Sequence, residues 1–206
     1  MYRGLFISFE GLDGSGKTTQ VKMLYDYLIE KNIPAIMLRE PGGAFVSEKI
    51  RSIIMENDIS PYTEALLYAA ARAELVGSVI KPSLLAKKIV VCDRFIDSSV
   101  AYQGYARGLG AENILNINKF GIGGLLPDIT FFMDITPEAS LKRRENATGL
   151  DRIESEGLAF HEKVYSGYKD LFLKFPGRIH RIDALGETVK IHNEIICFIE
   201  KQLFKD

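Results

Sequence analysis

Two features are scarce in this sequence of 206 residues: cysteine and long apolar runs. The two cysteines, Cys92 and Cys197, lie in distant parts of the chain, so their number and spacing provide neither a disulfide framework nor a zinc site. No run of about 18 consecutive apolar residues occurs, and Glu10 ends the first apolar stretch before it resembles a secretion signal. We therefore expect a cytoplasmic protein without a membrane partner.

An excess of positive charge is also missing. The chain has 26 lysine and arginine residues against 27 aspartate and glutamate residues, which leaves a net charge of −1. Proteins that bind the nucleic-acid backbone usually carry a basic excess, so we expect no nucleic-acid partner. Hydrophobic residues (47%) and charged residues (26%) occur in proportions typical of globular proteins, which excludes a disordered chain. At ~100–200 residues per domain, the length predicts a single domain over residues 1–206.

Strand-like and helix-like patterns alternate along the chain. This alternation predicts an α/β fold in which a five-stranded parallel sheet has helices on both faces. The expected strands are Leu5–Phe9, Ile33–Leu38, Ile89–Cys92, Ile129–Met133 and Arg178–Ile182. The expected helices are Lys17–Lys31, Val46–Met55, Tyr62–Ala86, Ser98–Tyr105, Ala111–Phe120, Ile153–Lys174 and Glu187–Phe204.

A complete phosphate-binding loop follows the first expected strand. The pattern G-x-x-x-x-G-K-[ST] is matched by Gly11, Leu12, Asp13, Gly14, Ser15, Gly16, Lys17 and Thr18. Glycines allow the backbone N–H groups to surround phosphate oxygens, and the start of the following helix adds partial positive charge. Lys17 would reach the β- and γ-phosphates, and the Thr18 hydroxyl would bind Mg²⁺. The motif predicts nucleoside triphosphate binding but does not identify the group that receives the phosphate.

The third expected strand ends in Asp93-Arg94, where open α/β sheets bind their ligands. Asp93 can hold the magnesium ion directly or through water, and Arg94 can bind a second phosphate with two parallel hydrogen bonds. The alternative for Arg94 is a salt bridge to a neighbouring acid. A GTPase is excluded because the only Asn-Lys pair, Asn118-Lys119, does not continue into the N-K-x-D guanine-binding motif.

Seven further segments extend the pattern over nearly the whole chain. In order they are Phe6–Glu10, Arg39–Gly43, Tyr68–Arg72, Asp93–Phe95, Ser98–Gly104, Pro127–Asp128 and Asp151–Glu154. With the phosphate-binding loop, their order and spacing resemble the thymidylate kinase family. The resemblance implies the three-layer P-loop NTPase fold with a short mobile lid, and a homodimer. It also implies Mg²⁺-dependent transfer of the ATP γ-phosphoryl group to thymidine 5′-monophosphate (dTMP).

The resemblance assigns a set of residues to dTMP. Tyr68 and Arg72 share a helix face, one turn apart, and would stack on thymine and reach the base. Without the other segments, Tyr68 would be read as a core residue and Arg72 as a surface charge. Tyr102 is expected to crowd a 2′-hydroxyl and so to favour deoxyribonucleotides. The remaining assignments are Ser99 and Gln103 beside the sugar and base, Asp13 near the sugar or phosphate (or capping the next turn), and Arg39, Glu40, Arg51 and Arg94 around the monophosphate.

Catalytic arginines are expected in a lid at about residues 141–152. Some members of the family carry an arginine inside the phosphate-binding loop, whereas others supply basic residues from the lid, and Gly14 places this chain with the second group. We expect Arg144 or Arg143 to fold over ATP and Arg152 to act from the far hinge. The alternative is a solvated basic loop, favoured by Glu145 and Ala147 where relatives are often basic.

Two rival functions remain. One is another small-molecule P-loop kinase, which would share the phosphate-binding loop but not the Tyr68–Arg72 and Ser99–Gln103 segments. The other is a nucleotide-dependent switch, against which the absence of switch and guanine-binding motifs counts. One further departure from the family is Ala44, which follows the Arg39–Gly43 segment where threonine is common.

Overall fold

The computed structural model describes residues 4–144, 152–153 and 155–203. Five parallel strands form one sheet in the order β2-β3-β1-β4-β5, which confirms the expected α/β fold. Every residue of β1 and β4 is buried, because helices cover both faces of the sheet. The strands are β1 (Leu5–Glu10), β2 (Ala35–Arg39), β3 (Ile89–Asp93), β4 (Ile129–Asp134) and β5 (Ile179–Asp183).

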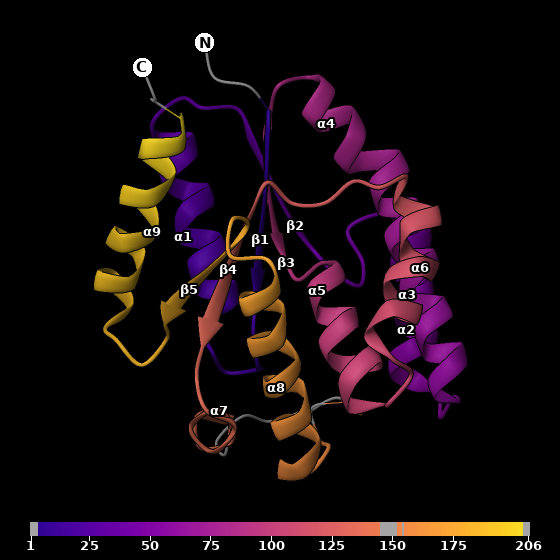
Figure 1. Cartoon of the computed structure of the whole chain (residues 1–206). Coiled ribbons are helices and arrows are strands. Elements are labelled where there is room, and N and C mark those ends of the chain that lie inside the picture. The colour runs from indigo at the N-terminus through magenta and orange to yellow at the C-terminus, as the bar shows by residue number, and fades with distance from the viewer. Residues whose placement is uncertain (1–3, 145–151, 154, 204–206) are drawn as a thin grey trace.

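The helices form a layer on each side of the sheet (Figure 1). On one side lie α1 (Lys17–Glu30) and α9 (Thr188–Leu203), which pack against each other. On the other side lie α2 (Phe45–Glu56), α3 (Pro61–Leu75) and α6 (Ala111–Ile122). The remaining helical elements are α4 (Lys81–Leu85), α5 (Ile96–Ser99), α7 (Pro137–Arg144), α8 (Leu158–Lys174) and two π-helical segments, Val76–Ile80 and Val100–Ala106.

Three expected helices differ from the observed ones. The helix expected over Ser98–Tyr105 is a short α-helix, Ile96–Ser99, followed by the π-helical segment Val100–Ala106. The helix expected from Ile153 begins at Leu158, because Gly157 adopts an extended conformation at its N-terminus. The long helix expected over Tyr62–Ala86 is present from Pro61 to Leu85, but a π-helical segment lies in its middle. The helix α7 was not expected. It takes up the first residues of the expected lid and carries three basic residues in its last turn, where they interact favourably with the helix dipole.

The sheet topology determines where a ligand can bind. The chain passes from β1 to β2 and β3 on one side, and then crosses to β4 and β5 on the other side of β1. A crevice forms at such a reversal, beyond the carboxyl ends of the strands. There the register pairs Phe9 with Asp93 and Arg39 with Asp93, so the segments after β1, β2 and β3 meet at one edge of the sheet.

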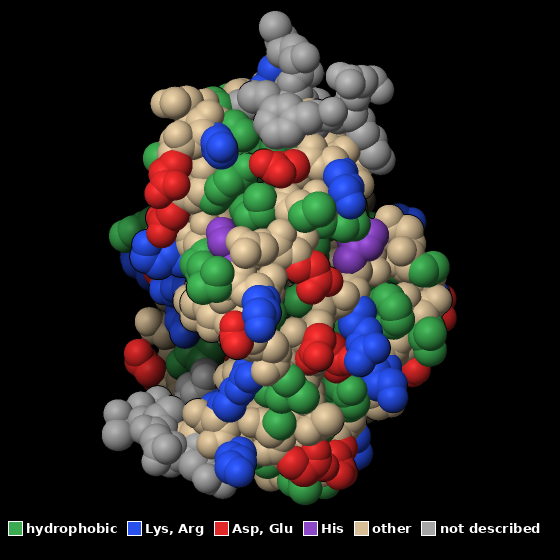
Figure 2. Space-filling view, turned by 90° about the vertical axis from the view of Figure 1, so that its left-hand side faces the viewer, with side chains coloured by type: hydrophobic (Ala, Val, Ile, Leu, Met, Phe, Trp, Pro, Cys, Tyr) green, Lys and Arg blue, Asp and Glu red, His purple; other side chains and the backbone are tan. Residues whose placement is uncertain are grey.

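The face of the molecule that carries α9 agrees with the balanced charge of the sequence. Figure 2 shows the face that carries α9, on which acidic and basic side chains are interspersed and form no continuous basic area. Within the described part of the chain, no helix is long and apolar enough to span a membrane.

Candidate active site

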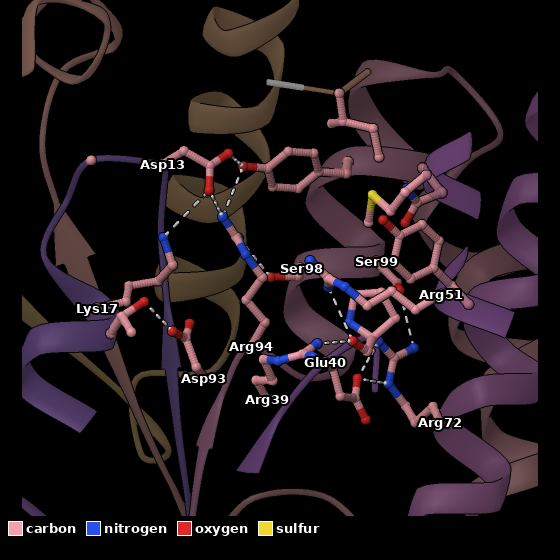
Figure 3. A pocket seen from close by; sticks show the side chains of 18 of the residues that line it. Asp13, Lys17, Arg39, Glu40, Arg51, Arg72, Asp93, Arg94, Ser98 and Ser99 are labelled. Carbon is pink, nitrogen blue, oxygen red and sulfur yellow. Dashed lines mark hydrogen bonds and ion pairs between the residues drawn. The ribbon is translucent and has the colours of Figure 1, made fainter. Parts of the chain in front are cut away.

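A cleft of about 480 Å³ opens at the carboxyl ends of β1, β2 and β3 (Figure 3). Its floor includes the loop from β1 to α1. Gly11 in this loop has φ +137°, and a Cβ atom there would lie 2.6 Å from the carbonyl oxygen of Met133. Gly14 has φ +77°, and its Cβ would lie 3.1 Å from the carbonyl oxygen of Ser140. Both positions therefore require glycine, which keeps the loop narrow enough to surround phosphate groups.

Lys17 is the first residue of α1 and is almost completely buried. Its Nζ donates a 2.7 Å hydrogen bond to the carbonyl oxygen of Leu12 and lies 3.9 Å from Oδ1 of Asp13. Burial and the nearby Arg94 lower the pKa of Lys17 to about 8, despite the neighbouring carboxylates. The ammonium group is thus held inside the loop, beside the position expected for the phosphates.

Thr18 and Asp93 form an oxygen pair at the same end of the cleft. The Thr18 hydroxyl donates a 2.5 Å hydrogen bond to Oδ2 of Asp93, and both residues line the cleft. Hydroxyl and carboxylate oxygens are ligands that Mg²⁺ prefers, and Mg²⁺ usually takes only one or two protein ligands beside phosphate oxygens and waters. The pair therefore fits a magnesium ion. Among the described residues, no larger group of His, Cys, Asp and Glu could hold a metal.

Arg94 connects the phosphate-binding loop to the acceptor half of the cleft. Its guanidinium group forms an ion pair with Asp13, which is the salt bridge considered as the alternative reading of Arg94. Arg94 also donates to the carbonyl oxygen of Gly11 (3.0 Å) and to the Ser98 hydroxyl (3.1 Å). Burial alone raises the pKa of Asp13, but Arg94 and Lys17 outweigh it and hold that pKa well below its usual range. Asp13 is therefore a carboxylate at neutral pH.

Tyr102 lies against the same ion pair. Its hydroxyl donates a 3.1 Å hydrogen bond to Oδ2 of Asp13, and the Arg94 guanidinium lies over its ring at 5.2 Å. Burial raises the pKa of Tyr102 well above its usual value, so the phenol remains a hydrogen-bond donor. The alternative role considered for Asp13, capping the next turn, would not explain its contacts with Arg94 and Tyr102.

Two arginines converge on the loop after β2. Arg39 Nη1 and Arg51 Nη1 donate to the carbonyl oxygen of Pro41, at 2.8 Å and 3.1 Å. Arg39 also pairs with Glu48 on α2 at 3.0 Å. Both guanidinium groups line the cleft next to Arg94, so three cations from different segments meet at its acceptor half.

Arg72 donates four hydrogen bonds and forms an ion pair with Glu40. Glu40 Oε2 accepts from Nε (2.7 Å) and lies 2.6 Å from Nη2. Nη1 donates to Ser99 Oγ (3.0 Å) and Asn118 Oδ1 (2.6 Å), and Nη2 donates to the carbonyl oxygen of Phe95 (3.1 Å). Arg72 is buried rather than a surface charge. Burial raises the pKa of Glu40 to about 7, although Arg72 acts in the opposite direction.

All ten residues that the resemblance assigned to dTMP line this one cleft: Asp13, Arg39, Glu40, Arg51, Tyr68, Arg72, Arg94, Ser99, Tyr102 and Gln103. Tyr68 is half-buried at the wall formed by α3 and packs against the core. Their individual roles remain predictions.

The three basic residues expected from the lid lie outside the wall of the cleft. Arg143 Nη1 lies 3.3 Å from the carbonyl oxygen of Gly14, and Nη2 donates to that of Ala184 (2.8 Å). Arg144 is buried, with Nη2 3.3 Å from His161 Nε2. Arg152 is paired with Glu64 at 2.5 Å. The rest of the expected lid, residues 145–151, and residue 154 of the Asp151–Glu154 segment lie outside the described residues.

Comparisons with known proteins agree with this geometry. A family model for thymidylate kinase matches residues 9–195. The chain belongs to the thymidylate kinase family. It is 50% identical to a thymidylate kinase from Thermoanaerobacter sp. (strain X514) over 203 residues, which cover 98% of this chain and 100% of the relative. It is 44% identical to one from Bacillus licheniformis over 205 residues, which cover 97% of each chain.

A solved structure extends the agreement to the fold. The crystal structure of thymidylate kinase from Ehrlichia chaffeensis superposes with a TM-score of 0.79 at 36% identity, and the match covers 96% of this chain and 99% of that one. The thymidylate kinase fold thus accounts for the five-stranded parallel sheet found here.

The sequence analysis missed two buried carboxylates that accept hydrogen bonds from residues lining the cleft, Glu10 from Ser98 and Glu64 from Gln103. Glu10 accepts hydrogen bonds from the Phe95 backbone N–H (2.7 Å) and from the hydroxyls of Ser98 (2.5 Å) and Tyr168 (3.1 Å). The sequence feature that could have revealed Glu10 is a charged residue at the end of a buried strand. Glu64 is fully buried on α3. Its signal was its position four residues before Tyr68 and eight before Arg72, on the same helix face.

Proposed function

We propose that the chain transfers the γ-phosphoryl group of ATP to dTMP, which yields ADP and thymidine 5′-diphosphate. The observation that carries this proposal is the single cleft that joins the phosphate-binding loop to all ten residues assigned to dTMP. A binding module without transfer would not need two phosphate-binding groups of residues facing each other.

The donor half of the cleft holds the triphosphate. Backbone N–H groups of the Gly11–Thr18 loop and the N-terminus of α1 bind the phosphate oxygens, and the Lys17 ammonium neutralises charge on the β- and γ-phosphates. Thr18 and Asp93 would hold Mg²⁺, which would supply positive charge to offset the negative charge of the phosphates.

The acceptor half holds dTMP. Arg39, Arg51 and Arg94 bind its phosphate, and Asp13 and Tyr102 contact the sugar, where the Tyr102 ring crowds a 2′-hydroxyl. Tyr68 stacks on thymine, while Arg72, Ser99 and Gln103 line the base.

The reaction is a direct in-line transfer. A phosphate oxygen of dTMP forms a bond to the γ-phosphorus of ATP as the bond from that phosphorus to the bridging oxygen breaks, and ADP leaves with the electron pair. The chain needs no covalent nucleophile. Its contribution is to hold the two phosphates in line and to neutralise their charge through Lys17 and Arg94, which line the cleft, and through Arg143, which contacts the carbonyl oxygen of Gly14 in the phosphate-binding loop.

We further propose that the protein acts as a cytoplasmic homodimer. Large apolar side chains on the packed helices α2, α3 and α6 are exposed: Phe45 (76%), Leu66 (58%) and Phe120 (93%). A second copy seated on these helices would remove them from water. Light scattering of the purified chain measures its mass in solution and so tests the dimer.

The function is tested by an ADP-release assay with ATP, Mg²⁺ and a panel of nucleoside monophosphates. We expect ADP to form with dTMP, and Lys17→Ala to abolish most of the signal. A wide preference for AMP or GMP would instead favour another nucleoside monophosphate kinase.

A further inference from the structure

Glu64 occupies an unusual position for a carboxylate. It lies in the first turn of α3 and is fully buried, with Tyr68 and Arg72 following it at intervals of four residues on the same helix face. A buried carboxylate requires hydrogen-bonding partners, because burial without them is costly. Its partners therefore indicate what it does.

Three donors from different segments converge on Glu64. Gln103 Nε2 donates to Oε1 at 2.9 Å, and Arg107 Nε donates to the same oxygen at 3.5 Å. Arg152 Nη2 donates to Oε2 at 2.5 Å. Gln103 lines the cleft, whereas Glu64 does not, so Glu64 acts on the cleft through Gln103.

The contact fixes the orientation of the Gln103 amide. A carboxylate only accepts hydrogen bonds, so the NH₂ group of Gln103 must face Glu64. The carbonyl oxygen, on the other branch of the same planar amide, is then the atom that can meet a ligand. A carbonyl oxygen accepts from the N3–H group of thymine or uracil, whereas N3 of cytosine is itself an acceptor and would be repelled.

We propose that Glu64 is a positioning residue for base selection: it holds the Gln103 amide with its carbonyl oxygen available to the substrate, so that the cleft favours a pyrimidine with an N3–H group. This inference rests on the proposed function, because it assumes that the base of dTMP lies beside Gln103. The two arginines keep the carboxylate in place. Arg107 is itself held by Glu156 at 2.5 Å and lies over the Phe160 ring at 4.7 Å.

The competing explanation is that Glu64 only balances the charges of Arg107 and Arg152. The two explanations differ in base discrimination, measured as the ratio of kcat/KM for dTMP to kcat/KM for deoxycytidine monophosphate (dCMP). Glu64→Gln keeps the size of the side chain but no longer forces the amide of Gln103 into one orientation. We expect this ratio to fall about tenfold, mainly through a higher KM for dTMP, while kcat changes less.

A matched control and a double variant separate the explanations. Glu156→Gln removes the same charge from the same cluster and a partner of Arg107, but contacts neither Glu64 nor Gln103 in the described residues, so the ratio should stay at the wild-type value. In Gln103→Ala there is no amide to orient. Adding Glu64→Gln to it should therefore leave the ratio unchanged, whereas a merely structural role would reduce activity towards both substrates further.

Each outcome decides a separate point. A wild-type enzyme that does not turn over dTMP would overturn the proposed function. An active wild type with the same ratio in Glu64→Gln would overturn this inference alone. If Glu64→Gln does not fold, Glu64→Asp keeps the negative charge near both arginines but shortens the side chain by one methylene group, which weakens the 2.9 Å hydrogen bond from Gln103, and the same fall in the ratio is expected.

Discussion

Thr18 and Asp93 lie 75 positions apart in the sequence, yet the Thr18 hydroxyl donates a 2.5 Å hydrogen bond to the Asp93 carboxylate. The contact joins the first turn of α1 to the last residue of β3. It brings two oxygen ligands to the junction between the donor and acceptor halves of the cleft, where a bound magnesium ion would contact the phosphates of ATP.

The first prediction concerns this oxygen pair. Asp93→Asn removes the negative charge that favours a divalent cation and keeps the shape of the side chain. We expect the Mg²⁺ concentration for half-maximal activity to rise about 10- to 100-fold, measured by titrating Mg²⁺ at saturating substrates. Thr18→Ser keeps the hydroxyl and should stay close to wild type. An unchanged Mg²⁺ requirement in Asp93→Asn would rule out this residue as a metal ligand.

The second prediction concerns Lys17. Lys17→Ala should lower kcat about 10²–10³-fold, because the ammonium group stabilises charge that develops during transfer. The exposed Lys22, on the same helix, is the control, and Lys22→Ala should be near normal. Since the pKa of Lys17 is about 8, wild-type kcat/KM for ATP should fall as the pH rises above that value and the free enzyme loses this proton. A flat profile up to about pH 10 would contradict the assignment.

The third prediction concerns stacking on the base. Tyr68→Ala should raise the KM for dTMP about 3- to 10-fold and change kcat little, because stacking contributes equally before and during transfer. Tyr68→Phe retains the ring and serves as the control. Steady-state kinetics at saturating ATP distinguishes the two parameters. If the alanine variant kept the wild-type KM, Tyr68 would be a packing residue only.

The fourth prediction concerns the basic residues after β4. Arg143 contacts the carbonyl oxygen of Gly14 in the phosphate-binding loop, so Arg143→Ala should lower kcat at saturating substrates by about 10²-fold or more. Arg152 is bound to Glu64, and Arg152→Ala should act mainly on the KM for dTMP. Near-normal kcat in Arg143→Ala, Arg144→Ala and Arg152→Ala alike would mean that these arginines do not take part in transfer.

The fifth prediction concerns stability against pH. Burial, reinforced by Asp97, raises the pKa of Glu10 to about 7, so the folded protein binds a proton there that the unfolded chain has already lost. The free energy of unfolding should therefore fall by about 1–3 kcal/mol between about pH 5.5 and about pH 7.5, measured by urea denaturation. Glu40, with a pKa of about 7, contributes in the same direction.

Two variants separate this effect from others. Glu10→Gln should make the fall in stability smaller, because the amide does not titrate, and the contribution of Glu40 should remain. Glu48 has a pKa lowered by the Gly43 N–H and by Arg39, so Glu48→Gln should retain the wild-type fall in stability. Equal slopes for Glu10→Gln and wild type would contradict the prediction.

Much of the fold follows from the sequence because each strand is a short apolar run bounded by a turn. The runs at Leu5–Phe9 and Ile129–Met133 lie inside the observed β1 and β4. The convergence of Asp13, Arg39 and Asp93 could also be anticipated, since parallel strands end at the same edge of the sheet.

The rest depends on contacts between distant segments, which no local pattern records. In the sequence, Glu64 is an acidic residue in the first turn of an expected helix, and its favourable interaction with the helix dipole is a sufficient reason for its presence there. Arg152 was expected to act from the far hinge of the lid, and the sequence does not reveal that its partner is this same Glu64, 88 positions away. The basic residues before residue 145 favoured an exposed loop, because charged side chains usually lie in solvent. In the structure they belong to α7, which packs against the phosphate-binding loop at Gly14.

The hydrogen bonds that hold the Arg72 side chain in place have a thermodynamic consequence. A free arginine on a surface samples many rotamers, and fixing it costs a ligand about 0.5–1.5 kcal/mol of binding free energy. Here four hydrogen bonds to Glu40, Ser99, Asn118 and Phe95 and the ion pair with Glu40 fix the side chain when the protein folds, before a nucleotide arrives. The conformational entropy of this part of the cleft wall is therefore lost on folding and not on binding. A nucleotide binds without having to order the Arg72 side chain.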